Sequence, residues 1–309
     1  MSVSPARGAD AAADYPSRPI RIIVPFQPGG LPDIAARLIG PRLVAAWKHP
    51  VVVDNRAGAG GIIGMEIVAK SAADGYTLLM SSPAHATLPA VHAKLPFDAV
   101  RDFSGITITS SGAYLLVVPA SLGVKTIKEL IGFARSRPGQ INFGSAGLGT
   151  GTHFAAELFN DLARVDAVHV AYKGIPDALT DTVAGRVQYF MPPLASAAGM
   201  MKDGRLRGLA ASQRVTGYEH IPTFEEAGVQ GYTWQAWAGL FAPARTPRPV
   251  INKLHAEVSR ILVLPEVKQR MATLGADAAP MSTAAFDKML GEQVALATRL
   301  AKKAGIKAQ

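Results

Sequence analysis

Apolar and polar positions along this chain fall into blocks that predict strands and helices in turn. Six-residue runs rich in β-branched and apolar side chains occur at 19–24, 49–54 and 76–81. Such runs are typical of strands buried on both faces of a parallel sheet. The segments 33–47 and 62–72, which lie between these runs, carry apolar residues at helical spacing. This alternation predicts an α/β domain with a mainly parallel sheet.

The pattern changes at about residue 103 and then repeats in a second block. Helices are expected at 127–136, 152–163 and 176–184, and strands at 106–108, 114–118, 141–144, 167–171, 187–191 and 206–211. The segment 233–243 is strand-like, and three helices are expected after it, at 249–263, 265–274 and 282–304. The chain therefore crosses into a second lobe near 113–120 and returns near 233–243. Two crossings form a hinge, which allows closure over a ligand.

A chain of 309 residues is long for a single hydrophobic core, so two domains are expected. We assign residues 15–116 and 240–309 to lobe 1 and residues 117–239 to lobe 2. Residues 1–14 are expected to be a disordered remnant, because they lack the apolar segment of a secretory signal although their Ala-rich end resembles a cleavage region.

Composition excludes several classes of function. The chain has no cysteine, which rules out disulfides and thiolate metal sites, and its net charge of +9 comes from scattered rather than clustered Lys and Arg. We therefore expect no nucleic-acid partner and interpret the charge as a general attraction for anions. No apolar run approaches the roughly 18 residues of a membrane span.

Two similar junctions stand out, each with a strand, a Gly-rich turn and a helix, at 20–38 and 141–159. A junction of this kind points unpaired N–H groups and the positive end of a helix dipole at one place, where an anion can bind. The candidate ligand contacts are Phe26, Gln27, Pro28, Gly29 and Gly30 in the first junction and Ser145, Ala146, Gly147, Gly149 and Thr150 in the second. An ordinary tight βα turn explains either loop alone, and with two such loops the two interpretations are evenly matched.

Four further residues near these turns are candidates for ligand contact: Asp33, Ser82, His85 and His153. Asp33 is better explained as a residue that complements the helix dipole and holds its loop in place. Ser82 and His85 belong to a small-residue loop after the third strand. His153 lies at a helix N-terminus, where a neutral packing or orienting imidazole is the alternative to a ligand contact. Trp234 and Trp237, at the return crossing, are interpreted as packing residues.

No motif for cofactor or metal chemistry is present. The glycine pattern falls short of G-x-G-x-x-G, no G-K-[ST] sequence occurs, and no histidine pair has metal-ligand spacing. Ser145 is one position away from a G-x-S-x-G nucleophile elbow, so a hydrolase triad has no local support. We expect no cofactor, no metal and no catalytic residue.

In order and spacing these segments resemble the Bug family, the extracytoplasmic solute-binding proteins of tripartite tricarboxylate transporters. The resemblance runs from Tyr15 through YPSRPIRIIVPFQPGG, VVVDNRAGAGG, DGYTLL, GLGTGTHFAAELF, VHVAYKG and WAGLFAP to the C-terminal helices. It implies a type II periplasmic-binding-protein fold with two α/β lobes around a ligand cleft. It also implies that backbone amides and ordered waters of loops 26–30 and 145–150 hold the ligand carboxylate.

The expected partners are a small organic acid and the membrane subunits of a tripartite tricarboxylate transporter, with the protein itself a monomer. The family implies a periplasmic location. A cytoplasmic location is expected instead if the native protein has no signal peptide. Two alternatives stay open: an input component of a sensor system, and an enzyme on the same fold that uses Asp33 and His153.

Two departures from the family bear on the ligand. Many relatives have an Asp near Met191 that can meet an amino group, so Met191 here predicts an acid without an ammonium: a dicarboxylate, a tricarboxylate or an aromatic acid. Relatives often have Asn-Pro where this chain has Leu88-Pro89, which predicts a more apolar third loop at the cleft.

Overall fold

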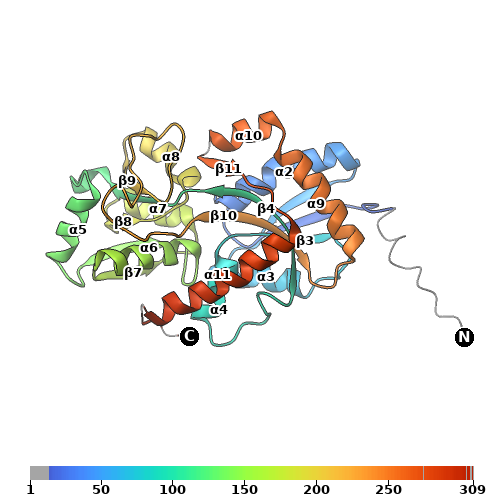
Figure 1. Ribbon diagram of the computed structural model, residues 1–309, viewed down its shortest axis with the longest axis horizontal. Coiled ribbons are helices and arrows are strands. Elements are labelled where there is room, and N and C mark those ends of the chain that lie inside the picture. The colour runs from blue at the N-terminus through green and yellow to red at the C-terminus, as the bar shows by residue number, and fades with distance from the viewer. Residues whose placement is uncertain (1–13, 274, 304, 307, 309) are drawn as a thin grey trace, which may run out of the picture.

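The computed structural model describes residues 14–273, 275–303, 305, 306 and 308. Two α/β lobes lie side by side, each built on its own sheet, and two long strands, β4 and β10, run from one lobe towards the other (Figure 1). The expectation for residues 1–14 falls almost entirely outside the described residues. The predicted two-lobed α/β architecture is confirmed.

The strands of the first sheet are β1 (Ile20–Val24), β2 (Val51–Asn55), β3 (Thr77–Ser81), β4 (Phe103–Gly112), β10 (Ala236–Pro243) and β11 (Ala276–Ala278), and those of the second are β5 (Leu115–Pro119), β6 (Ile141–Ser145), β7 (Ala167–Ala171), β8 (Tyr189–Phe190) and β9 (Leu206–Ala211). The helices are α2 (Leu31–Trp47), α3 (Ile62–Ala69), α4 (Ala84–Val91), α5 (Ile127–Arg135), α6 (Gly151–Ala163), α7 (Ile175–Val183), α8 (Leu194–Lys202), α9 (Arg248–Leu262), α10 (Pro265–Ala272) and α11 (Thr283–Lys303).

Both sheets are mixed, whereas the alternation predicted mainly parallel sheets. In the first sheet β1 pairs in parallel with β2 and β3, but β10 is antiparallel to both β3 and β4. In the second, β6 pairs in parallel with β7 and β8, and β5 is antiparallel to β8 and β9. The antiparallel pairs of β5 and β10 arise at the crossings, because each of these two strands enters its sheet from the other lobe.

Each sheet is covered on both faces, which explains its apolar strands. Ile20, Ile22 and Val24 of β1 lie in one core cluster with residues of α2 and α9. Ile23, from the opposite face of the same strand, clusters with residues of α3, α4 and α11. The first cluster continues into lobe 2 through Phe143 and the aromatic face of α6, so the two lobes share one continuous core.

Three elements differ from the sequence prediction. The segment after β3 was expected to be a loop, but α4 begins at Ala84, where the Ser82 hydroxyl oxygen accepts a hydrogen bond from the Ala84 N–H. Its small residues are good helix formers, and their lack of a clear apolar stripe concealed the helix. Helix α8 and the short strand β11 were also not predicted, since neither has a distinct periodic pattern.

The crossings lie between β4 and β5 and between β9 and β10. The predicted boundaries at 116/117 and 239/240 fall inside β5 and β10. By sheet membership we propose instead that lobe 2 begins at β5 and that the chain returns to lobe 1 with β10.

Helix α11 forms a third connection between the lobes. Its first turns pack Phe286 and Leu290 into the core of lobe 1. Its last turns reach α6 of lobe 2, where the Lys303 ammonium lies 2.7 Å from a carboxylate oxygen of Asp161. Leu300 and Phe154 line one small pocket between these two helices. The C-terminal helix therefore spans both lobes (Figure 1).

Candidate functional site: a pocket between the lobes

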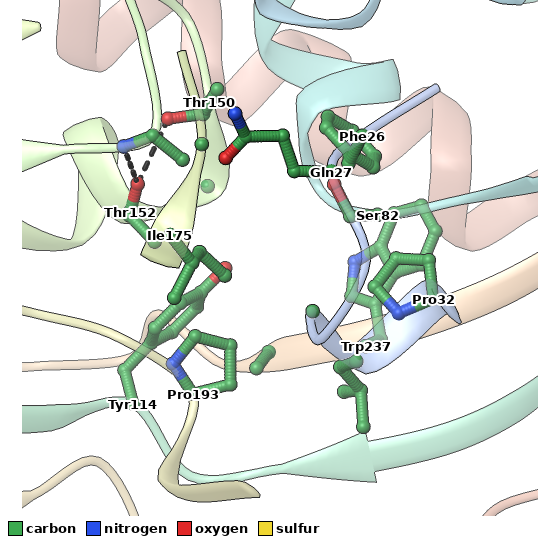
Figure 2. Close-up of a pocket in the computed structure, with 16 residues that line it drawn as sticks. Phe26, Gln27, Pro32, Ser82, Tyr114, Thr150, Thr152, Ile175, Pro193 and Trp237 are labelled. Carbon is green, nitrogen blue, oxygen red and sulfur yellow. Dashed lines mark hydrogen bonds between the residues drawn. The ribbon is translucent and has the colours of Figure 1, made fainter. Parts of the chain in front are cut away.

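A pocket with a cavity volume of about 40 Å³ lies between the lobes. Lobe 1 contributes Phe26, Gln27, Gly30, Leu31, Pro32 and Ser82; lobe 2 contributes Ala146, Thr150, Gly151, Thr152, Gly174, Ile175 and Pro193; Tyr114, Ala236 and Trp237 come from the crossings. Figure 2 shows the side chains of the two lobes facing each other across this space. The volume suffices for a few water molecules, so an organic acid requires the lobes to move further apart than here.

Four helices begin at the wall of this pocket. The N-cap residues of α2, α6, α7 and α8 are Gly30, Thr150, Gly174 and Pro193, and all four line the pocket. Each helix N-terminus carries roughly half a positive charge and unpaired N–H groups. None of the residues that line the pocket, in the part of the chain that the structure describes, is Asp, Glu, Lys or Arg. The pocket is therefore positive through backbone dipoles and not through charged side chains.

A hydrogen-bond network behind the first loop fixes its shape. The buried Asp33 carboxylate accepts hydrogen bonds from the Gly29 N–H, the Arg37 guanidinium and the Asn55 amide, each at 3.0 Å. The Asn55 amide also donates to the Phe26 carbonyl at 3.0 Å. Gly29 has a φ of +93°, which favours glycine. Asp33 thus holds the loop in place and does not face the pocket.

We expect Asp33→Ala to reduce the free energy of unfolding by about 2 kcal/mol, because the substitution removes the one buried acceptor shared by the Gly29 N–H, the Arg37 guanidinium and the Asn55 amide. The measurement is urea unfolding of the unliganded protein, with the exposed Asp203→Ala as the matched control, expected to stay within about 0.5 kcal/mol of wild type. An Asp33→Ala variant as stable as the control would contradict the positioning role.

The second loop is supported in the same way from within lobe 2. The Ser145 hydroxyl lies 2.6 Å from His169 Nε2 and accepts a hydrogen bond from the Gly147 N–H. His153 Nδ1 accepts from the Gly149 N–H at 3.3 Å, and its ring stacks on that of His169 with centroids 4.0 Å apart. Burial and the neighbouring His153 lower the pKa of His169 to about 3. His169 is therefore neutral at ordinary pH, and the two stacked rings orient the loop from behind.

The structure places part of the predicted residues in the pocket wall. Those that line it are Phe26, Gln27, Gly30, Ser82, Ala146 and Thr150. Pro28 and Gly29 are exposed beside it, and Asp33, Ser145, Gly147, Gly149 and His153 form the supporting networks described above. Ligand contact stays a prediction for all of these residues. For Asp33, Ser145, Gly147, Gly149 and His153 the structure shows a supporting role behind the pocket wall.

Two predicted contacts lie away from the pocket. His85 is fully buried, with Nε2 2.7 Å from the Ala99 carbonyl oxygen and its ring stacked on Phe241, because it belongs to α4 and not to a loop. Met191 is fully buried in the core of lobe 2. Leu88 is also buried inside α4 and does not line the pocket, so the predicted apolar third loop is wrong.

Sequence reasoning missed several lining residues. Trp237 and Tyr114 were not predicted to line the pocket, because the segments at the crossings were interpreted as packing elements. Trp237 lines the pocket and also donates its indole N–H to the Gln293 side chain at 2.8 Å. Gly174 and Ile175 begin a helix directly after a strand, with Pro176 in the first turn. That is the same signal as in the first junction, so this third helix N-terminus was open to prediction.

Direct contacts close the lobes over the pocket. The Gln27 amide donates to an Asp177 carboxylate oxygen at 3.1 Å, and the Ser196 hydroxyl donates to the Gly29 carbonyl oxygen at 3.2 Å. The Thr87 hydroxyl of lobe 1 donates to the Gly149 carbonyl oxygen of lobe 2. The structure is therefore that of a closed form.

Two α/β lobes, two crossing strands and a pocket enclosed between the lobes define the periplasmic-binding-protein class of fold. The model of the tripartite tricarboxylate transporter family receptor matches residues 36–306. The protein BugT of Bordetella pertussis is 34% identical over 273 residues, which cover 87% of this chain and 84% of BugT.

Solved structures agree with this assignment. The structure described as R. palustris Rpa4515 with adipate superposes with a TM-score of 0.92 at 33% identity, covering 96% of this chain and 100% of that one. MatC from Rhodopseudomonas palustris with bound malate gives a TM-score of 0.86 at 29% identity, covering 93% of this chain and 99% of that one. The chain belongs to the tripartite tricarboxylate transporter receptor family, and the resemblance to Bug proteins is confirmed. Among the described residues, no helix is both long and apolar enough to span a membrane.

Proposed function

We propose that this protein captures a small organic carboxylate between its lobes and does not transform it. The observation that carries the proposal is the convergence of four helix N-termini on a pocket whose described wall holds no charged side chain. A carboxylate placed there gains favourable dipoles and N–H donors without a cationic partner. The adipate and malate in the two structures named above are acids of this class.

A binding role is better supported than an enzymatic one. The alternative enzyme used Asp33 and His153, but both side chains are engaged in holding loops. The described residues include no group of three or more potential metal ligands. The Ser145 and His169 pair lies behind the loop, with Ser145 fully buried, so its hydroxyl does not reach the pocket.

We propose that the protein works in the periplasm as a monomer and delivers its ligand to the membrane subunits of a tripartite tricarboxylate transporter. Membership of the receptor family supports this assignment over the sensor alternative. Closure would present a surface that the open protein lacks, because the contacts of Gln27 with Asp177 and of Ser196 with Gly29 form only when the lobes meet.

A ligand at about 100 times its dissociation constant should add about 2.7 kcal/mol to the free energy of unfolding. We expect a clear rise in Tm with at least one acid in a thermal-shift screen of succinate, adipate, malate, citrate, benzoate, phthalate and nicotinate, and none with aspartate or glutamate. The matched control is the diamide of each active diacid, which has the same shape without the charge. No shift with any carboxylate would contradict the proposed function.

The exclusion of amino acids no longer rests on Met191, which is buried away from the pocket. It follows instead from the lining, since no described acidic side chain faces the pocket to pair with an ammonium group. Burying that cation beside four positive helix ends is unfavourable.

A further inference from the structure

Strand β2 forms a free edge of the first sheet, because β1 is its sheet neighbour and no described strand pairs with its other side. The Pro50 carbonyl oxygen and the Arg56 N–H make hydrogen bonds with β1. Backbone groups of successive residues in a strand point to opposite sides, so those of Val51, Val53 and Asn55 point away from the sheet. These outward groups, which we call the β2 edge, can pair with an extended segment of another chain.

An open apolar hollow with a volume of about 490 Å³ lies beside the β2 edge, between β2 and α2. Its lining residues are Arg37, Gly40, Pro41, Val44, Val51 and Val53. Gly40 adds no side chain to it, and a Cβ there would lie 3.8 Å from the side chains of both Val51 and Val53. Residues paired across neighbouring strands point their side chains to the same face of a sheet. A segment paired with the β2 edge would therefore place every second side chain over the hollow.

Both ends of the β2 edge are positively charged. Among the described residues that line the hollow, Arg37 is the one with a charged side chain, and that side chain is half-exposed. It donates to Asp33 at 3.0 Å and to the Asn55 side chain at 2.8 Å, and its Nη1 has no hydrogen-bond partner in the described structure. The exposed Lys48 precedes the other end of the strand. Carboxylates on a docked segment would complement these two cations.

The same charges disfavour pairing between two copies of this chain. A two-fold dimer would join the two β2 edges antiparallel, with Val51 of one copy opposite Asn55 of the other. The Lys48 end of each copy would then face the Arg37 end of its partner. Like charges placed opposite each other are unfavourable, so the edge suits an acidic partner better than a second copy.

We propose that the β2 edge and its hollow dock an extended acidic segment of the transporter's membrane subunits, which adds to the first sheet as a strand. Its apolar side chains would lie over the hollow, and one of its carboxylates would bind Arg37. This inference rests on the proposed function and names a surface through which the ligand is delivered. The surface is close to the pocket loop, because the Asn55 amide at the end of β2 holds the Phe26 carbonyl oxygen at 3.0 Å.

The test measures uptake of a radiolabelled acid into proteoliposomes that contain the membrane subunits, with the full chain added at saturating acid. Gly40→Leu fills the hollow and replaces a helix glycine by a better helix former, so the fold should be kept. We expect half-maximal uptake to need at least about tenfold more of this variant than of wild type, with unchanged affinity for the acid. Gly132→Leu, in α5 with no atom within 4 Å of the added Cβ, is the matched control and should behave as wild type. Equal requirements for Gly40→Leu and wild type would overturn the inference.

Two further pairs of variants test the backbone edge and the charge. Val53→Pro removes an outward N–H and keeps the hydrogen bonds to β1, whereas Ala167→Pro does the same on β7, an edge strand of the second sheet. Arg37→Gln removes the cation of the hollow, whereas Arg101→Gln removes an exposed arginine elsewhere on lobe 1. The first member of each pair should raise the half-maximal concentration by at least about tenfold, and Arg37→Gln should also reduce the dependence of uptake on salt.

The outcomes separate this inference from the proposed function. Wild-type uptake with both Val53→Pro and Arg37→Gln would overturn the inference and leave the delivery role intact. A wild-type dimer in analytical ultracentrifugation that Val53→Pro converts to a monomer would also overturn it, because a second copy would then occupy the edge. Binding of an acid without any stimulation of uptake by wild type would overturn the delivery role itself, and this inference with it.

Discussion

Gly30→Asp is expected to weaken binding of the carboxylate ligand by at least about 100-fold. Gly30 is the N-cap of α2, with φ of −78° and ψ of 163°, a conformation that Asp adopts readily at this position. A Cβ there meets only Ile175 at 3.6 Å and Pro32 at 3.8 Å, so the side chain fits. The introduced carboxylate would occupy the field of the converging helix N-termini, which then repels a second anion.

Gly30→Asn is the matched control for this prediction, because Asn has the same shape and is as good an N-cap but has no charge. We expect it to lose at most about tenfold in affinity. Calorimetric titration with the acid identified in the screen measures both variants. Equal loss in the two would attribute the effect to size, and would contradict an anion site at this helix terminus.

Acidification is expected to lower the free energy of unfolding by about 3 kcal/mol between pH 6.5 and pH 4 through His85 alone. Burial lowers the pKa of this imidazole to about 4, although its hydrogen bond to the Ala99 carbonyl oxygen raises it in part. In the unfolded chain a histidine has a pKa of about 6.5. Between these values the unfolded state binds more protons than the native state, so stability falls as the pH falls, and above pH 6.5 the effect vanishes.

The measurement is urea unfolding across this pH range for wild type and His85→Phe. Phe keeps the stacking on Phe241 and does not titrate, so the slope with pH should flatten even though the variant loses about 1 kcal/mol at pH 7 with the Ala99 hydrogen bond. His220→Gln, an exposed site, is the control and should keep the wild-type slope. His169 acts in the same direction as His85, so a residual slope is expected in His85→Phe. An unchanged slope would contradict the prediction.

The architecture was open to prediction because it depends on local signals. The strands β1 and β7 and the helices α5 and α6 were predicted to within a few residues from apolar runs, and Thr126 caps α5 by accepting a hydrogen bond from the Glu129 N–H. The Gly-rich junctions before α2 and α6 also marked the pocket, since helix N-termini after parallel strands gather at one edge of a sheet.

The direction of each side chain was not open to prediction in the same way. His153 and Thr150 stand three positions apart at one helix terminus, yet Thr150 lines the pocket and His153 packs on His169 from another strand. Trp237 lines the pocket although its neighbour Trp234, three residues before it, donates to the Gly151 carbonyl oxygen inside lobe 2. Such differences depend on contacts between segments that are far apart in the chain, and a single sequence does not contain those distances.

The C-terminal helix has a practical consequence for handling the protein. Because α11 ends against α6 through the pairing of Lys303 with Asp161, any opening of the lobes about β4 and β10 must also stretch or release this contact. We therefore expect an affinity tag fused next to Lys303 to change the measured dissociation constant, although the tag lies far from the pocket. Binding constants should therefore be compared between samples with the tag removed.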